Sequence, residues 1–365
     1  MNRRRDALRK ILREEGQGAN GMLVVSVANV TYLTGFTGDS SVLLVLPDRE
    51  VVISDGRYTE QLARECAGVE CHIRPVGQPL YVGVAEVANR LGLTSLAFES
   101  ASISVADFQV LKDLLPTVET QPTRSWVERL RMVKDAGELD QIRHAIQLAE
   151  TAFTELRAGL KLGQTEKALA DDLEFGMRRA GASGSAFPPI LAVGANAALP
   201  HYRPGATARL GDADFLLVDW GATGPGGYRS DLTRMVVTGK FTDQFTRIYN
   251  AVLEAQTQAI SAICPGRTAG EVNARARASL SDAGLAEYFT HGLGHGFGLE
   301  IHEMPFMGRE PDVRLEPGMV LTVEPGVYLP GWGGIRIEDD VLITSEGVEV
   351  LTSLPRDLAS TLRPV

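Results

Sequence analysis

The sequence has few cysteines, no long hydrophobic run and no excess of positive charge. Its three cysteines, Cys66, Cys71 and Cys264, form no C-x-x-C pair, which argues against a disulfide framework or a zinc ribbon and for a reducing compartment. Apolar runs such as VLLVL at 42–46 are far shorter than a membrane-spanning helix requires. The N-terminal MNRRRDALRKILREEG has no secretory core. These absences predict a cytoplasmic protein with no membrane partner.

The charge balance and the length narrow the class further. The chain carries 36 Lys and Arg against 46 Asp and Glu, a formal net charge of -10, which argues against a nucleic-acid partner. Hydrophobic residues make up 44% and charged residues 22%, as in ordinary globular proteins. A chain of 365 residues predicts two domains or one large one.

The pattern changes near residue 123. Before it, short β-rich runs (MLVVSV, SVLLVL, VVIS, SLAF) alternate with helical stretches such as 58–67 and 105–114, which is typical of an α/β domain. The segment PTVETQP at 116–122 interrupts this pattern and is interpreted as a linker. We therefore expect an α/β N-terminal domain over residues 1–123 and a second domain over residues 124–365.

The second domain repeats one arrangement, two helices followed by a hairpin. Thr165 opens the second helix of the first unit, and Thr242 and Thr268 are candidate N-caps for the helices of the second unit, which run to about 263 and 283. The two hairpins are FLLVDWGATGPGGYRSDLTRMVVTG and MVLTVEPGVYLPGWGGIRIEDDVLITSEG. The pattern predicts an α+β domain with one curved antiparallel sheet and helices on its outer face.

Both hairpins carry acids inside strands that should be buried. Strand alternation places Asp219 on one face with Phe215 and Leu217, and Asp231 lies on the returning strand. Glu324 and Glu338 repeat this arrangement in the second hairpin. Four carboxylates on one sheet are unfavourable unless they are protonated or neutralised, and a divalent cation is the natural neutralising group.

The histidines support a metal site. The second domain contains His201, and the glycine-rich segment HGLGHGFGLEIH contains His291, His295 and His302. Carboxylates with an imidazole suit Mn, Co, Fe or Zn, and four carboxylates fit two ions better than one.

The segments VDWGA, YRSDLTR, THGLGHGFGLEIHE, TVEPGVY and GIRIEDDV resemble the five ligand motifs of the pita-bread metallopeptidases. The resemblance is to the proline-specific branch, prolidase and aminopeptidase P, and it covers the whole second domain. The first domain resembles the creatinase-like N-terminal domain of that branch. The resemblance therefore implies a creatinase-like α/β domain followed by a pita-bread catalytic domain.

The resemblance also implies roles for individual residues. Two divalent ions (Mn, Co or Zn) would be bound by Asp219, Asp231, His295, Glu324 and Glu338. A hydroxide that bridges the ions would attack the Xaa-Pro bond, with Glu324 as the proton acceptor. His201 and His302 would move protons or stabilise charge, and substrate would contact His291, Arg336 and Arg57.

The sequence departs from the family pattern in two places. Asp231 follows Asp219 by twelve residues where the family usually has eleven, a difference that a longer turn would absorb. Phe306 stands where prolidases place an arginine that binds the carboxylate of the dipeptide. Arg57 is our leading substitute, because a cation from a neighbouring domain would also block longer peptides, and Arg203 and Arg309 are alternatives.

The sequence leaves several functions open. We expect a homodimeric Xaa-Pro dipeptidase, since homodimers are the commonest soluble assembly. The alternatives are an aminopeptidase P that acts on longer Xaa-Pro peptides, a methionine aminopeptidase, and a non-catalytic pita-bread module that binds a protein partner.

Overall fold

The computed structural model describes residues 2–363 of the chain. The fold divides after Arg131 into two compact units, each of which is described below by itself.

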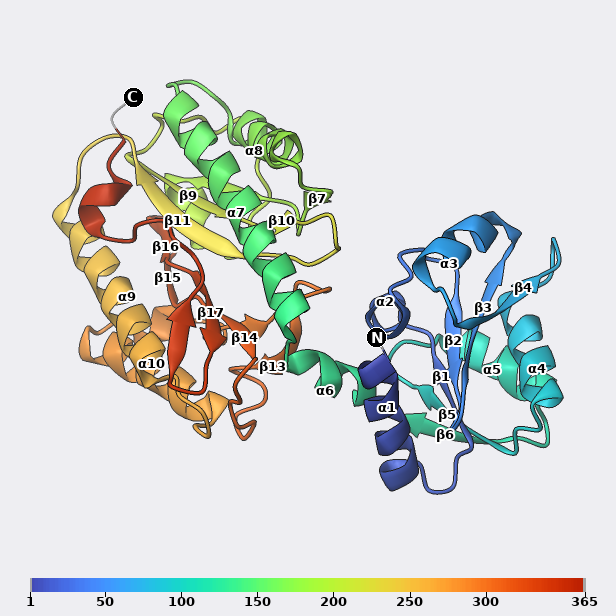
Figure 1. Ribbon diagram of the computed structural model, residues 1–365. Coiled ribbons are helices and arrows are strands. Elements are labelled where there is room, and N and C mark those ends of the chain that lie inside the picture. Colours follow the sequence, from blue (N-terminus) through green and yellow to red (C-terminus); the bar gives the residue numbers. More distant parts are fainter. Residues whose placement is uncertain (1, 364–365) are drawn as a thin grey trace. The chain divides into compact units, whose positions relative to one another are not determined.

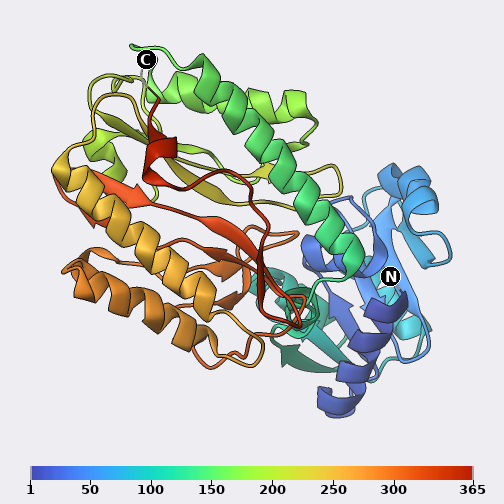
Figure 2. The same cartoon turned by 60° about the vertical axis from the view of Figure 1, so that its left-hand side comes forward.

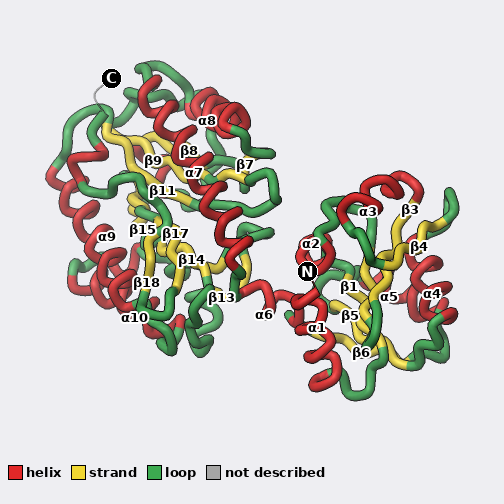
Figure 3. Tube along the Cα trace, viewed as in Figure 1, coloured by secondary structure: helices red, strands yellow, loops and turns green. Residues whose placement is uncertain are grey.

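The first unit is an α/β domain, as predicted. Its six-stranded mixed sheet has the strand order β4-β3-β2-β1-β5-β6, and Figure 3 shows helices on both sides of that sheet. The strands are β1 (Gly21–Val24), β2 (Val42–Val45), β3 (Glu50–Asp55), β4 (Glu70–Arg74), β5 (Ser95–Glu99) and β6 (Glu119–Thr123). The helices are α1 (Asn2–Glu15), α2 (Val27–Thr34), η1 (Gly56–Tyr58), α3 (Thr59–Glu65), α4 (Leu80–Arg90), α5 (Val105–Leu114) and α6 (Trp126–Met132).

The linker predicted at 116–122 is wrong. Residues 119–123 form β6, which pairs in parallel with β5. Pro122 lies in this strand because β6 is at the edge of the sheet, where a missing N–H costs no ladder hydrogen bond. The compact unit consequently extends past the predicted boundary at residue 123, through most of α6.

The second unit has the predicted order of paired helices and β-ribbons (Figure 1). Its helices are α7 (Ala136–Gly159), α8 (Glu166–Ala180), η2 (Gly194–Ala198), α9 (Asp243–Ala262), α10 (Ala269–Asp282), η3 (Ala286–Tyr288) and η4 (Leu358–Thr361). Its strands are β7 (Gly184–Ser185), β8 (Ile190–Val193), β9 (Phe215–Trp220), β10 (Ala222–Thr223), β11 (Leu232–Val237), β12 (His295–Gly296), β13 (Glu303–Phe306), β14 (Val320–Val323), β15 (Gly326–Leu329), β16 (Gly333–Arg336), β17 (Asp339–Ile343) and β18 (Val348–Val350).

An antiparallel sheet runs through this unit in two halves. The strand orders are β11-β9-β8 and β13-β12-β14-β17-β18, and a single bridge between Thr233 and Glu338 connects the halves. The second ribbon is not one continuous hairpin, because β14 pairs with β17 and β15 pairs separately with β16. Glu324 and Glu338 lie where the first pairing ends and the second begins.

Polar caps and apolar faces fix the helices. The Thr242 hydroxyl accepts from the Phe245 N–H, and Thr268 forms a capping box with Glu271, so both predicted N-caps are confirmed. Figure 2 shows α9 and α10 running side by side.

The alternation predicted for β9 is also confirmed. Phe215 and Leu217 belong to the core that packs against α9 and α10. Leu216, Val218 and Trp220 belong to the core that packs against α7 and α8. Within residues 2–363, no helix combines the length and the apolar composition needed to cross a membrane.

Trp220 secures β9 beside Asp219. Its buried ring stacks on Phe153 with centroids 4.4 Å apart, and its indole N–H donates to the Ala149 carbonyl at 3.0 Å. We predict that Trp220→Phe lowers the free energy of unfolding by about 1–3 kcal/mol, because a buried carbonyl loses its donor and a small cavity forms. Urea unfolding followed by circular dichroism measures this. Trp332→Phe at the half-buried β15–β16 turn is the control, and an equal effect of both substitutions would contradict the prediction.

Candidate metal centre

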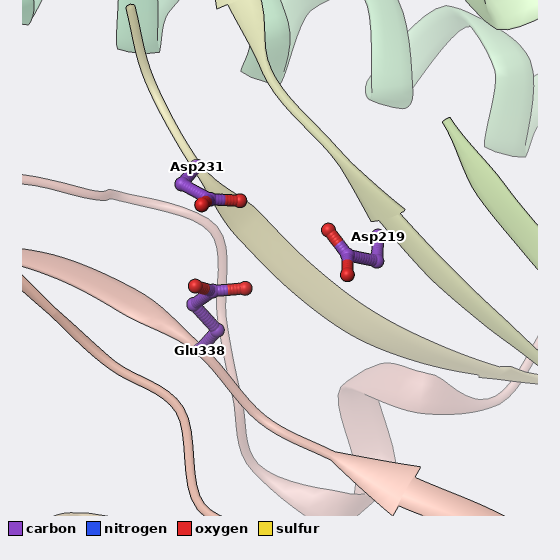
Figure 4. A group of neighbouring side chains, drawn as sticks. All are labelled: Asp219, Asp231 and Glu338. Carbon is purple, nitrogen blue, oxygen red and sulfur yellow. The ribbon is translucent and has the colours of Figure 1, made fainter. Parts of the chain in front are cut away.

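Three buried carboxylates meet between the two halves of the sheet. Asp219 comes from β9, Asp231 directly precedes β11 and Glu338 directly precedes β17. One oxygen from each lies within 4.8 Å of the others, and Figure 4 shows the three carboxylates pointing toward one another.

His295 and Glu324 extend this cluster. His295 Nε2 lies 3.6 Å from Asp231 Oδ2 and 3.6 Å from Glu324 Oε1. The structure therefore brings together all five side chains that the resemblance implied as ligands.

The imidazole of His295 is oriented for metal binding. Its Nδ1 lies 3.0 Å from the Gly296 carbonyl oxygen, an acceptor that requires the proton on Nδ1. Nε2 then carries no proton and directs its lone pair toward the carboxylates. Metal-bound histidines have the same arrangement. Burial, together with the charge of His302, lowers the pKa of His295 to about 3, so the ring is neutral at physiological pH.

The carboxylates lack the charge compensation that burial requires. Burial raises the pKa of Asp231, and the charges of Glu338 and Asp219 raise it further. The pKa of Glu338 is raised by burial, Glu324 and Asp219, and burial raises that of Glu324 to about 8. Asp219 Oδ1 is buried and has no hydrogen-bond partner among the described residues. The site thus offers several carboxylate oxygens, one of them without a partner, and one imidazole nitrogen. Such a set of ligand atoms fits a divalent cation.

Arg336 is part of a buried network beside the cluster. Its guanidinium is paired with Asp219 and donates to Thr233 Oγ1 at 3.0 Å and to the Tyr328 hydroxyl at 2.7 Å. Thr233 donates in turn to Glu338 Oε2 at 2.6 Å, and the Tyr328 oxygen lies 2.9 Å from His291 Nε2. Sequence reasoning missed Thr233 and Tyr328, although both lie within or beside the quoted motifs.

Two further histidines lie beside the candidate metal ligands. The His302 ring lies 4.5 Å from the His295 ring, centroid to centroid. Burial lowers the pKa of His302, and His201, Arg309 and Arg229 lower it further, so these side chains lie near His302. His201 and His302 are both exposed, as residues that meet substrate must be.

Sequence reasoning also missed Glu166, which organises the segment that carries His201. Glu166 is fully buried at the start of α8. Its carboxylate accepts from the Val193 and Gly205 amides at 2.7 and 3.3 Å and from the Tyr202 hydroxyl at 2.7 Å. No local pattern signals this role, because the partners lie far along the chain.

Arg57 belongs to the first unit. Its guanidinium forms a two-pronged ion pair with Asp55, with both contacts at 2.9 Å. The hydrogen bonds from Arg57 lower the pKa of Asp55 to about 2. The side chain of Arg57 is exposed.

A cluster of carboxylates and one histidine, set in a sheet split between two β-ribbons, is compatible with a metallopeptidase. The chain belongs to metallopeptidase family M24, whose sequence profile matches residues 140–345. Residues 4–133 match the creatinase/prolidase N-terminal domain. The predicted family and fold class are thereby confirmed.

Relatives match along nearly the whole chain. An uncharacterized peptidase of Bacillus subtilis is 38% identical over 93% of this chain and 96% of its own length. The structure of a Xaa-Pro dipeptidase from Bacillus anthracis matches with a TM-score of 0.92 and 37% identity, covering 98% of this chain and 99% of that one. The X-Pro aminopeptidase from Thermotoga maritima matches with a TM-score of 0.87 and 35% identity, over 96% and 99%.

We predict that the metal-free protein loses stability as the pH rises from 7 to 9. Glu324 has a folded pKa of about 8, above its unfolded value, so the folded state retains a proton that the unfolded state has released. The loss from Glu324 alone is on the order of 1 kcal/mol. His295 contributes little above pH 7, because it is neutral in the folded state and already mostly neutral in the unfolded state. Thermal and urea unfolding with chelator, at both pH values, measure the change.

Two controls accompany this measurement. Saturating Mn²⁺ should remove the pH dependence, since a bound cation stabilises the ionised carboxylates. Glu324→Gln should reduce the dependence without metal. Metal-free protein that is equally stable or more stable at pH 9 contradicts the assignment.

Proposed function

We propose that the chain hydrolyses the peptide bond before proline with two divalent ions, Mn, Co or Zn, and that dipeptides are its preferred substrates. The observation that carries this proposal is the convergence of Asp219, Asp231, Glu338, His295 and Glu324 at one buried point. The Bacillus anthracis match, described as a Xaa-Pro dipeptidase, supports the substrate class.

The five side chains divide between two ions in this proposal. Asp219 would bind one ion, and His295 and Glu324 would bind the other. Asp231 and Glu338 would each bind both ions. When bound, the ions would lower the pKa of a bridging water to supply a hydroxide nucleophile, and would polarise the carbonyl before proline.

The protein's own groups would handle protons and position the substrate. Glu324 would accept the proton of the attacking water, since its carboxylate lies beside His295 at the centre. His302, beside His295, would stabilise charge on the carbonyl oxygen. His201 would pass a proton to the leaving nitrogen. His291 is held by Tyr328 and would contact the substrate.

The charges around His302 favour a dipeptide. Arg309 and Arg229 both lower the pKa of His302, so a negatively charged group of the substrate would be attracted there. The Arg309 guanidinium lies 5.8 Å from the centre of the Phe306 ring. Arg309 thus lies beside Phe306, which stands where prolidases place an arginine. We therefore favour Arg309 over Arg57 as the residue that binds the substrate carboxylate.

Aminopeptidase P activity is the second candidate. It is supported by Phe306 itself and by the Thermotoga maritima match, described as an X-Pro aminopeptidase. The homodimer and the cytoplasmic location stay predictions.

The Mn²⁺-loaded protein should hydrolyse a Xaa-Pro dipeptide at least 10-fold more efficiently than the matching Xaa-Pro-Yaa tripeptide. A negatively charged carboxylate directly on proline gains an ion pair that the tripeptide cannot form at the same position. Measuring kcat/KM for both substrates tests this, with Glu324→Gln as the inactive control. Equal or better cleavage of the tripeptide favours aminopeptidase P, and failure on every Xaa-Pro peptide refutes the proposed function.

We predict that Arg309→Ala raises KM for the dipeptide at least fivefold and leaves KM for the tripeptide nearly unchanged. The reason is the loss of one charge-assisted hydrogen bond to the substrate carboxylate. Arg57→Ala is the matched comparison, because it removes the same charge from the first unit. If Arg57→Ala alone has this effect, the clamp is Arg57.

A further inference from the structure

One buried amide contacts the backbone next to both ligand glutamates. Gln256 lies in α9 and is completely buried. Its side-chain nitrogen donates to the carbonyl oxygens of Val323 at 3.1 Å and Ile337 at 3.2 Å. It also lies 3.0 Å from Asp339 Oδ2, so its two protons are shared among three acceptors.

These contacts fall where the second ribbon changes partners. Val323 precedes Glu324 and Ile337 precedes Glu338. The β14–β17 ladder ends at the pair Val323 and Asp339, and the β15–β16 ladder begins at Gly326. Between them the bond from the Ile337 N–H to the Pro325 carbonyl is 3.5 Å long. Backbone pairing within the second ribbon is therefore weak at this point.

The other supports of the two glutamates come from different elements. Glu338 is held from β11 by the Thr233 hydroxyl, and the Glu324 amide donates to the Leu293 carbonyl at 2.8 Å. Each of these contacts restrains one glutamate only. Gln256 restrains the backbone of both.

The side chain of Gln256 has both apolar and polar neighbours. Its buried neighbours on α9 are apolar: Val252, Ala255, Ala259 and Ile260. Its oxygen accepts from Arg356 at 3.4 Å. A buried amide is unfavourable unless it is hydrogen-bonded, so Gln256 depends on these polar contacts.

We propose that Gln256 is a positioning residue that sets the separation of Glu324 and Glu338 and thereby the retention of the second ion. This inference rests on the proposed two-ion site. Glu324 would bind only the ion held by His295, whereas Glu338 would bind both. A change in the separation of the two glutamates would therefore lower the affinity for one ion more than for the other.

The test compares Mn²⁺ binding by the full-length wild type and Gln256→Met, by competition with a fluorescent chelator. We expect the weaker site to lose at least 10-fold in affinity and the tighter site to stay within threefold. Electron paramagnetic resonance should show a coupled Mn pair in the wild type and mainly isolated Mn in the variant at equal loading. The kcat for the dipeptide should fall at limiting Mn²⁺ and recover at high Mn²⁺.

Tyr249→Phe is the matched control. Tyr249 is a fully buried residue of the same helix whose hydroxyl donates to the Arg356 carbonyl at 2.9 Å, away from both glutamates. This variant should leave Mn²⁺ affinity unchanged even if it lowers the melting temperature. If Gln256→Met does not fold, Gln256→Leu replaces it, and the measurements are repeated.

Unchanged affinity at both sites in a folded Gln256 variant overturns the inference, as does an equal loss at both sites. Wild-type protein that binds one Mn²⁺ or fails to cleave any Xaa-Pro peptide refutes the proposed function instead. The two failures are therefore distinguishable.

Discussion

Mutual repulsion among buried carboxylates is the constraint on which the second unit depends. Asp219, Asp231 and Glu338 lie close together with little exposure to water, where ionised groups are costly unless a cation accompanies them. Arg336 compensates only Asp219 directly. The remaining negative charge is compatible with a bound divalent cation, which would neutralise it.

Asp219 lies inside β9, paired on both sides, whereas the other acids come from positions where regular pairing stops. Asp231 stands one residue before β11, and Glu324 and Glu338 stand at the ends of the β14–β17 ladder. A strand end leaves the side chain free to turn inward, while the adjacent ladder keeps its backbone fixed. The bridge between Thr233 and Glu338 places the acids of the two ribbons opposite one another.

The sequence pattern was sufficient to predict those features that depend only on residues close together in the chain. The caps at Thr242 and Thr268 and the alternation in β9 follow from short-range rules. By contrast, β6 was missed because proline normally indicates the end of a strand. Only an edge strand such as β6 accommodates it without losing a ladder hydrogen bond. The division of the second ribbon into two separate strand pairs was also missed. Its turn residues are as compatible with one continuous hairpin as with two strand pairs. The role of Glu166 depends on segments brought together only by folding, because its partners Val193, Tyr202 and Gly205 lie far along the chain.

The consecutive acids Glu338, Asp339 and Asp340 show how strand alternation separates function from structure. Asp339 points to the opposite face and accepts from Arg234, Thr352 and Arg356 at 2.6–2.8 Å. Burial alone would raise the pKa of Asp339, but these partners hold it below the ordinary value. Asp340 accepts from the Asp231 amide at 3.2 Å and so restrains the backbone of Asp231. One acid thus joins the carboxylate cluster, one anchors the strand to the arginines behind it, and one connects the two ribbons. Because the side chains alternate, a register shift of one residue in β17 would exchange these roles and leave the cluster facing arginines.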